Sequence, residues 1–464
     1  MRKLTSPPLS AEQHGVVGDP TPGVVGLHGP AGSGKTAVAI RRAAELARVR
    51  LREREEASSS EPVRVTLLVY DTPLVGYVGD VVAHHLPRHP LLRVRVETPQ
   101  TFNRSVAKYH GLTWPKNARE KRIWELGEGL GLSHGRLRYE VDQVLGTYHP
   151  DRLNEYITGH PTAPAFNAHE ELTPELRRAV VNRVAVPLHQ FKAEHGLVDD
   201  HDLAAMAAAA PSSTETQSDI LVVDDAQHAS ATQVRAIARH TAPEHASTFV
   251  FDDLPGVPSR ATALVEHTHH LSRGWRCPGS VVALATGILG SRPQDGIALH
   301  KHAAAEAPRG TRPTLWGDPR RLIDHLVRQL EDLDPVEQSA LVVSFGGPEH
   351  LSQLRLTLEA AGIDFAELDE ARPWPADEPG VAIAEPHAAT GLEFDHVAVL
   401  DINAEQATAS ETARHGVPLE VLRRALATTV LRARKSVTLG YDARKPPGLA
   451  RCIEPATVVD VPYR

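Results

Sequence analysis

The fold of this 464-residue chain is decided by one stretch, Gly29-Pro30-Ala31-Gly32-Ser33-Gly34-Lys35-Thr36. The apolar run 24–27 precedes this stretch, and an alanine-rich helical pattern follows it from Ala37. The order is therefore strand, glycine loop, helix, with the spacing G-x-x-x-x-G-K-[ST]. A glycine-rich turn without a ligand is the alternative, but the lysine, the hydroxyl and the flanking elements all coincide here. The stretch predicts a phosphate-binding loop.

The chemistry of such a loop assigns a role to each residue type. Glycines let backbone N–H groups surround phosphate oxygens, and the helix N-terminus adds partial positive charge. We expect Lys35 to bridge the β- and γ-phosphates of ATP, and the Thr36 hydroxyl to ligate Mg²⁺. The predicted nucleotide-binding residues of the loop are Gly29, Gly32, Ser33, Gly34, Lys35 and Thr36.

The bulk composition bounds the class of protein. A hydrophobic content of 41% with 23% charged residues is that of an ordinary globular protein, and the length allows two to four domains. No apolar run approaches the ~20 residues of a membrane span. Two cysteines are too few for a disulfide framework or a zinc site. We expect a cytoplasmic protein with no membrane partner. The net charge of −8 means that nucleic acid would have to bind in a local groove.

Strand and helix patterns alternate along the chain, which favours an α/β fold with parallel sheets. The region 112–195 has mixed charge and helical periodicity, and we interpret it as a helical insertion, with Thr173 as an N-cap and Pro174 as the first helical residue. Other helices are predicted over 37–56, 348–361 and 420–435. Strands are predicted over 63–70, 92–97, 220–223, 247–251, 339–345, 381–384, 395–400 and 436–441.

A second motif carries carboxylates. The apolar strand 220–223 ends in Asp224-Asp225. With a phosphate loop upstream, we expect Asp224 to hold Mg²⁺ and Asp225 to act as the base for the attacking water. The alternative is a pair of capping residues before the helix that begins near Ala231.

The order of these motifs resembles that of superfamily 1 DNA helicases of the UvrD/Rep type, from Leu9 to about Leu439. The resemblance implies two tandem RecA-like parallel-sheet domains, those of a P-loop NTPase, with the helical insertion in the first. The implied boundaries are 1–111 and 196–272 for the first domain, 112–195 for the insertion and 273–464 for the second domain. The resemblance also implies an ATP-hydrolysing enzyme.

The resemblance extends to individual positions. Arg276 and Arg432 match the family's two arginine fingers, which reach the γ-phosphate and complete the catalytic set of Lys35, Asp224 and Asp225. Further nucleotide contacts are implied for Gln13, Gln227, Trp275, Gly391 and Glu393. Contacts with single-stranded DNA are implied for Asp71, Thr72, Thr101, Phe102 and His387.

Two functions are compatible with these motifs. The first is ATP-dependent translocation on DNA, or its unwinding, with single-stranded DNA as the partner and RNA left open. The second is an ATP-gated module with slow hydrolysis that acts through a protein partner, such as a nuclease in DNA repair or defence. Asp225 stands where the family has Glu, and the segment 251–257 has neither the family's Gln nor an aromatic residue downstream. Both departures favour the second function.

Overall fold

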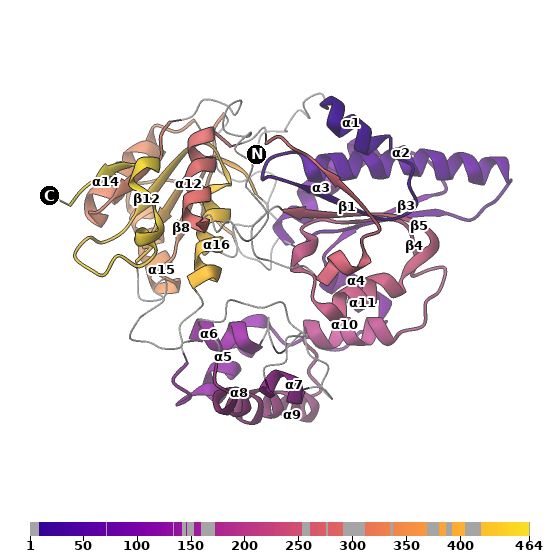
Figure 1. Cartoon of the computed structure of the whole chain (residues 1–464), viewed down its shortest axis with the longest axis horizontal. Coiled ribbons are helices and arrows are strands. Elements are labelled where there is room, and N and C mark those ends of the chain that lie inside the picture. Colours follow the sequence, from indigo (N-terminus) through magenta and orange to yellow (C-terminus); the bar gives the residue numbers. More distant parts are fainter. Residues whose placement is uncertain are drawn as a thin grey trace.

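The computed structural model describes the larger part of the chain. The described residues are 9–70, 72–132, 134–141, 145, 153–158, 172–252, 260–274, 277–290, 311–334, 337–368, 380–386, 392–403 and 419–463. Figure 1 shows two sheet-containing units side by side and a group of helices below them.

The first unit is built on a parallel sheet of six strands in the order β3-β2-β4-β5-β1-β6. Parallel strands need crossover connections, and helices supply most of them here (Figure 1). The strands are β1 (Gly23–Gly29), β2 (Val63–Leu68), β3 (Leu92–Glu97), β4 (Ser218–Val223), β5 (Thr241–Asp252) and β6 (His267–His270).

Helices cover both faces of this sheet. Alternate residues of β4 show it, because Ile220 and Val222 share a core with α2 and α3, whereas Leu221 and Val223 pack with α4, α10 and α11. The helices of this unit are α1 (Ala11–Val17), α2 (Lys35–Glu56), α3 (Thr72–His85), α4 (Pro99–Val106), α10 (Asp200–Ala209) and α11 (Ala231–Arg239), with the short helices η6 (Ala226–His228) and η7 (Arg260–Leu264).

The second unit has a parallel sheet of seven strands in the order β13-β7-β12-β11-β8-β10-β9. Its strands are β7 (Thr314–Trp316), β8 (Ala340–Ser344), β9 (Ala366–Glu367), β10 (Val381–Ala384), β11 (Phe394–Leu400), β12 (Ala433–Gly440) and β13 (Val459–Val461). Its helices are α12 (Gly279–Leu289), α14 (Pro319–Glu331), α15 (Pro348–Ala360), α16 (Leu419–Val430), η9 (Gly448–Cys452) and η10 (Pro455–Thr457).

The same alternation organises the second sheet. Leu341 and Val343 of β8 share a core with α12 and α16, whereas Ala340 and Val342 pack with the leucines of α14 and α15. The expected α/β fold with two parallel sheets is confirmed.

The helical group comprises α5 (Lys116–Gly127), α6 (His134–Tyr139), α7 (Leu153–Thr158), α8 (Pro174–Val180), η5 (Val181–Ala185) and α9 (Val186–His195) around its own apolar core. Thr173 caps α8 and Pro174 is its first residue, as predicted. The two chain segments that join this group to the first unit meet, because Thr113 and Val198 form a parallel bridge.

Ionic contacts reinforce this junction. Asp199 caps α10, and its Oδ2 accepts from Arg119 Nε at 3.1 Å and Lys192 Nζ at 2.9 Å. Burial alone would raise the pKa of Asp199, but the two cations hold it well below its usual range. The helical group is thus tied to α10 by charges from two of its helices.

One predicted helix is wrong at its C-terminal end. The sequence predicted a helix over 420–435, but α16 ends at Val430 and β12 begins at Ala433. The β-branched residues 428–430 lose side-chain freedom in a helix, so the chain leaves the helix there. Arg432 therefore lies in the turn between helix and strand. By contrast, α2 ends at Glu56 and β3 spans 92–97, as predicted.

Within the described ranges, no helix combines the length and apolarity that crossing a membrane demands.

Candidate nucleotide site

The glycine stretch forms a tight loop between β1 and α2. Gly32 and Gly34 have φ angles of 74° and 82°, a region that strains residues with a Cβ. Gly34 is the N-cap of α2, and a Cβ there would lie 2.9 Å from Gln13 Nε2. The loop therefore places its backbone at the N-terminus of a helix of 22 residues, where N–H groups and the helix dipole favour an anion.

Lys35 lies inside this loop and is only 6% exposed. Its Nζ donates to the carbonyl oxygens of Gly29 at 2.8 Å and Pro30 at 3.0 Å. Ser33 Oγ is buried without a hydrogen-bond partner among the described residues. A buried ammonium and an unsatisfied hydroxyl on one loop fit an anionic ligand with several oxygens.

Thr36 and Asp224 come together although their strands are not neighbours. β5 lies between β1 and β4, yet Thr36 Oγ1 donates to Asp224 at 3.0 Å from Oδ1 and 2.9 Å from Oδ2. Asp224 is 7% exposed, and its own N–H bonds Leu68 O. A hydroxyl beside a carboxylate is an oxygen donor set that suits Mg²⁺ together with phosphate oxygens. Among the described residues no three His, Cys, Asp or Glu side chains are grouped so that they could hold a metal ion, so protein groups here would share Mg²⁺ with phosphate oxygens.

Asp225 adopts a left-handed backbone conformation, with φ 50° and ψ 43°. Gln227 Nε2 donates to its Oδ1 at 3.1 Å, so the amide predicted to touch nucleotide holds this carboxylate. Tyr70 lies close by, and burial, with the negative charge of Asp225, raises the pKa of the Tyr70 hydroxyl. No local pattern indicates Tyr70 as a site residue, because only the adjacency of β2 and β4 brings it near Asp225.

Gln13 connects α1 to the loop. Its Oε1 accepts from Ser10 N at 2.8 Å in a capping box, and its Nε2 donates to Ser33 O at 2.8 Å. The side chain is 7% exposed. The amide that was predicted to contact the nucleotide is therefore already bonded at both ends to the protein backbone.

Two predicted residues of the second unit have different surroundings. Arg432 is 9% exposed, and its Nε is buried without a hydrogen-bond partner in the part of the chain that the structure describes. Glu393, predicted to bind the ribose, accepts from Arg434 at 3.1 Å from Nε and 2.8 Å from Nη2. An arginine two positions after Arg432 therefore neutralises Glu393, and the sequence analysis missed this pair.

The residues predicted to contact DNA differ in how much of their side chains is exposed. Thr72 begins α3, and Thr101 is exposed in the first turn of α4. Phe102, however, is 2% exposed and belongs to the core under α4, with its ring edge-on to His240. The amphipathic α4 directs this ring into the sheet and leaves Phe102 little surface to offer DNA, so its predicted contact stays a prediction.

Five predicted site residues lie outside the described residues. They are Asp71, Trp275, Arg276, His387 and Gly391. Their predicted roles stay predictions.

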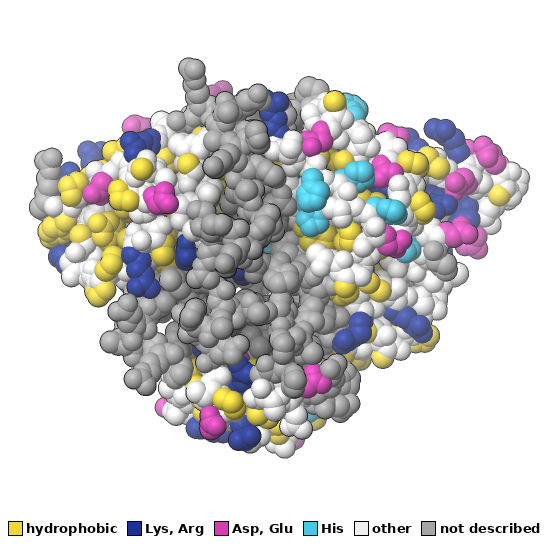
Figure 2. Space-filling view, in the orientation of Figure 1, with side chains coloured by type: hydrophobic (Ala, Val, Ile, Leu, Met, Phe, Trp, Pro, Cys, Tyr) yellow, Lys and Arg dark blue, Asp and Glu magenta, His cyan; other side chains and the backbone are white. Residues whose placement is uncertain are grey.

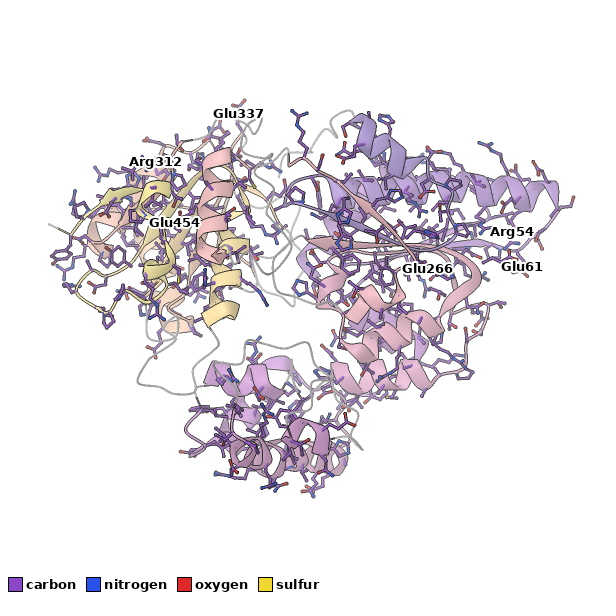
Figure 3. All side chains as sticks on the ribbon, in the orientation of Figure 1. Arg54, Glu61, Glu266, Arg312, Glu337 and Glu454 are labelled. Carbon is purple, nitrogen blue, oxygen red and sulfur yellow. The ribbon has the colours of Figure 1, made fainter. Side chains whose placement is uncertain are left out.

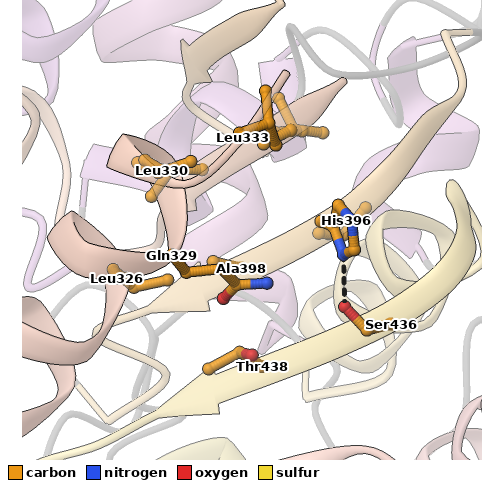
Figure 4. A pocket seen from close by; sticks show the side chains of 12 residues that line it. Leu326, Gln329, Leu330, Leu333, His396, Ala398, Ser436 and Thr438 are labelled. Atoms are coloured by element: carbon orange, nitrogen blue, oxygen red, sulfur yellow. Dashed lines mark hydrogen bonds between the residues drawn. The ribbon is translucent and has the colours of Figure 1, made fainter. Parts of the chain in front are cut away.

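A hollow in the second unit lies away from this site. It is lined by apolar residues of α14 and by β11 and β12, where His396 Nδ1 and Ser436 Oγ are 2.8 Å apart (Figure 4). Burial lowers the pKa of His396. All lining residues belong to the second unit, so we do not assign this hollow to the nucleotide.

Histidines gather over the first unit on the face shown in Figure 2. β6 contributes three, of which His267 and His270 are exposed and His269 pairs with Asp19 at 2.7 Å. Burial raises the pKa of Asp19, but hydrogen bonds from Thr21 and His269 outweigh it and lower the value to about 2. These histidines lie on the surface of the edge strand β6.

Comparison with known proteins gives little further information. No family model matches the chain. A search of curated proteins finds no match either. Among solved structures, the C-terminal domain of a possible DNA helicase from Lactobacillus plantarum is similar at 22% identity, over 40% of this chain and 98% of that one, with a TM-score of 0.29. A likeness this loose carries no argument about fold or function.

Proposed function

We propose that this chain is an ATP-hydrolysing, helicase-like motor that acts on DNA. The observation that carries the proposal is the contact between Thr36 and Asp224, 2.9 Å at its shortest, at the carboxyl edge of a parallel sheet. It joins the predicted Mg²⁺ ligand of the phosphate loop to the predicted Mg²⁺ ligand of β4. Ligands of open parallel sheets bind at this edge.

The residues present fit Mg²⁺ and ATP. Lys35 and the loop backbone would hold the phosphates, while Thr36 and Asp224 would hold the metal. When bound, Mg²⁺ neutralises charge that develops on the phosphate oxygens. Asp225 would orient or deprotonate the attacking water.

Arg432 supports a site shared with the second unit, which we propose to be a second RecA-like domain. A buried guanidinium is costly unless an anion compensates it. Its Nε lacks a partner in the described part of the chain, and a terminal phosphate would supply the missing negative charge. In this proposal ATP draws the two units together and hydrolysis releases them, which moves the chain along single-stranded DNA.

The proposal is tested by steady-state ATPase measurements with and without single-stranded DNA, and with single-stranded RNA in parallel. We expect Mg²⁺-dependent turnover that DNA stimulates, with Lys35→Ala as the blank. Turnover that neither nucleic acid changes would contradict a motor. Absence of ATP binding would contradict the whole proposal.

A second function, an ATP-gated module that hydrolyses slowly and acts through a nuclease, is favoured by Asp225. Its carboxylate is one methylene shorter than that of Glu, and Gln227 holds it at 3.1 Å. A displacement on the order of 1 Å can cost ~10²-fold in rate. A carboxylate of Asp225 that is shorter than that of Glu and hydrogen-bonded to Gln227 would make ATP turnover slow.

Asp225→Glu separates the two functions. For a motor, the longer side chain reaches the water better, so we expect kcat to rise severalfold while DNA stimulation is kept. We also expect slightly lower thermal stability, because Glu tolerates the left-handed conformation less well than Asp. The measurement is kcat and the Kd for ATP, with and without DNA. A lower kcat with unchanged Kd would show that the site is adapted to Asp225.

A further inference from the structure

One contact joins α1 to the segment that connects the two sheets. This connecting segment, which the structure describes at 271–274 and 277–278, follows β6 and precedes α12. Ser272 N donates to both carboxylate oxygens of Glu12, at 3.0 and 3.1 Å, and Ser272 Oγ donates to Glu12 Oε2 at 3.2 Å. Hydrogen bonds to a charged acceptor are the stronger kind. A single exposed side chain therefore anchors the beginning of the connecting segment.

The same end of α1 also holds the phosphate loop. Gln13, the next residue, donates to Ser33 O. The connecting segment lies directly against the loop, because a Cβ on Gly29 would be 2.9 Å from Leu271 O, and one on Gly274 would be 3.0 Å from Ala31 O. The start of α1, the loop and the connecting segment thus form one junction, in which Glu12 and Gln13 bind different partners.

The other end of the connecting segment reaches Arg432. Cys277 Sγ donates to Leu431 O at 3.1 Å, and both side chains are buried in one continuous apolar cluster that also contains Leu27 and Leu271. Leu431 directly precedes Arg432. One short stretch of chain therefore contacts the phosphate loop at its start and the neighbour of Arg432 at its end.

We propose that Glu12 is a positioning residue for the nucleotide site. By fixing Ser272 on α1, it sets where the connecting segment lies on the phosphate loop. It thereby sets the place of Arg432 relative to phosphates held by Lys35. This inference rests on the proposed function, because it assigns Glu12 to the alignment of groups that act on ATP.

The test uses the full chain and the variants Glu12→Ala and Glu12→Gln. The first readout is the rate of hydrogen–deuterium exchange at the backbone amides of 271–274, measured without nucleotide. We expect Glu12→Ala to speed their exchange on the order of tenfold, the loss of a charge-assisted hydrogen bond. Glu12→Gln keeps one acceptor and should show an intermediate rate. Exchange in β1 and β5 should not change.

The second readout separates binding from turnover. We expect the Kd of a fluorescent ATP analogue to stay within about twofold, because Lys35 and the loop are intact, while kcat falls roughly tenfold or more through misplacement of Arg432. The control is Glu61→Ala. Glu61 is an exposed carboxylate with a distant ion pair of 3.9 Å to Arg64, and Figure 3 shows it at the end of the first unit farthest from the second.

Two results would overturn the inference while leaving the proposed function intact. The first is unchanged exchange at 271–274 in Glu12→Ala, which would mean that Glu12 does not hold the segment. The second is faster exchange with unchanged kcat, which would make the contact an anchor without a positioning role. A different result would contradict the proposed function itself, and the positioning role that depends on it. That result is an unmodified chain that does not hydrolyse ATP and whose amides at 29–36 exchange no more slowly when Mg²⁺·ATP is added.

Discussion

Arg432→Ala is expected to lower kcat at least tenfold while the Kd for ATP stays nearly the same. An arginine that reaches the terminal phosphate typically contributes ~10³–10⁵ in rate, so tenfold is the low end of what its loss should cost. Nucleotide affinity depends mainly on the loop around Lys35, which this change does not touch. The measurements are single-turnover and steady-state hydrolysis together with equilibrium binding.

The thermal unfolding temperature distinguishes an arginine finger from an arginine with a structural role. Arg432 is 9% exposed, and its Nε has no partner among the described residues. The variant loses no hydrogen bond of Nε to a described residue and no longer buries a guanidinium, whose burial carries a desolvation penalty, so the Tm of the nucleotide-free chain should stay equal or rise. A merely structural arginine would give a lower Tm instead. An unchanged kcat would show that Arg432 does not act as an arginine finger.

The matched control for Arg432 lies three positions later. Lys435 has a half-exposed side chain and pairs with Asp395 at 3.2 Å. Lys435→Ala removes a cation from β12, the strand that follows Arg432. It leaves the turn that carries Arg432 unchanged. We expect kcat and Kd to remain those of the unmodified chain.

Lys35→Ala is expected to abolish measurable ATP binding and to lower kcat/KM by ~10²–10³ or more, the usual cost of removing one preorganised donor to developing charge. Its Nζ is the buried cation of the loop and bonds two loop carbonyls, Gly29 O and Pro30 O. The measurements are equilibrium binding of a fluorescent ATP analogue and steady-state ATPase activity.

The variant also has a structural consequence that must be measured separately. Gly29 O and Pro30 O both lose the bond from Lys35 Nζ, although Pro30 O keeps the one from Ser33 N at 3.1 Å, at a cost of ~1–3 kcal/mol for a buried carbonyl left unsatisfied. We therefore expect a modest drop in Tm in the absence of nucleotide. Lys121→Ala, at an exposed lysine of α5, serves as the control and should change neither Tm nor binding. Undiminished ATP binding by folded Lys35→Ala would contradict the proposed site.

Local patterns along the chain were enough to predict much of the fold. The alternation of apolar strands and helices indicated two parallel sheets, and the capping signals at Thr173 and Pro174 located a helix start correctly. The helix predicted over 420–435 ran too far because its charged residues continue into β12, where sheet pairing overrides local helical preference. The strand β7 and its neighbour at the sheet edge, β13, are three residues each, too short for a periodic signal.

The site was predictable where adjacent residues carry the chemistry, and less so where distant segments meet. The Lys35–Thr36 and Asp224–Asp225 pairs can be read from their flanking strands. The bond of Gln227 to Asp225, the pair of Glu393 with Arg434 and the burial of Phe102 depend on how helices and strands pack. The hold of Glu12 on Ser272 joins residues 260 positions apart, which no local pattern indicates.

The junction of the helical group has a mechanical consequence. A body attached by two chain segments that touch, as Thr113 and Val198 do, could swing freely about their meeting point. Asp199, the N-cap of α10, restricts such rotation, because it binds Arg119 of α5 and Lys192 of α9 at the same time. These bonds hold the helical group in one orientation against α10, which itself contacts α4 and α11 on the face of the sheet that leads to Asp224.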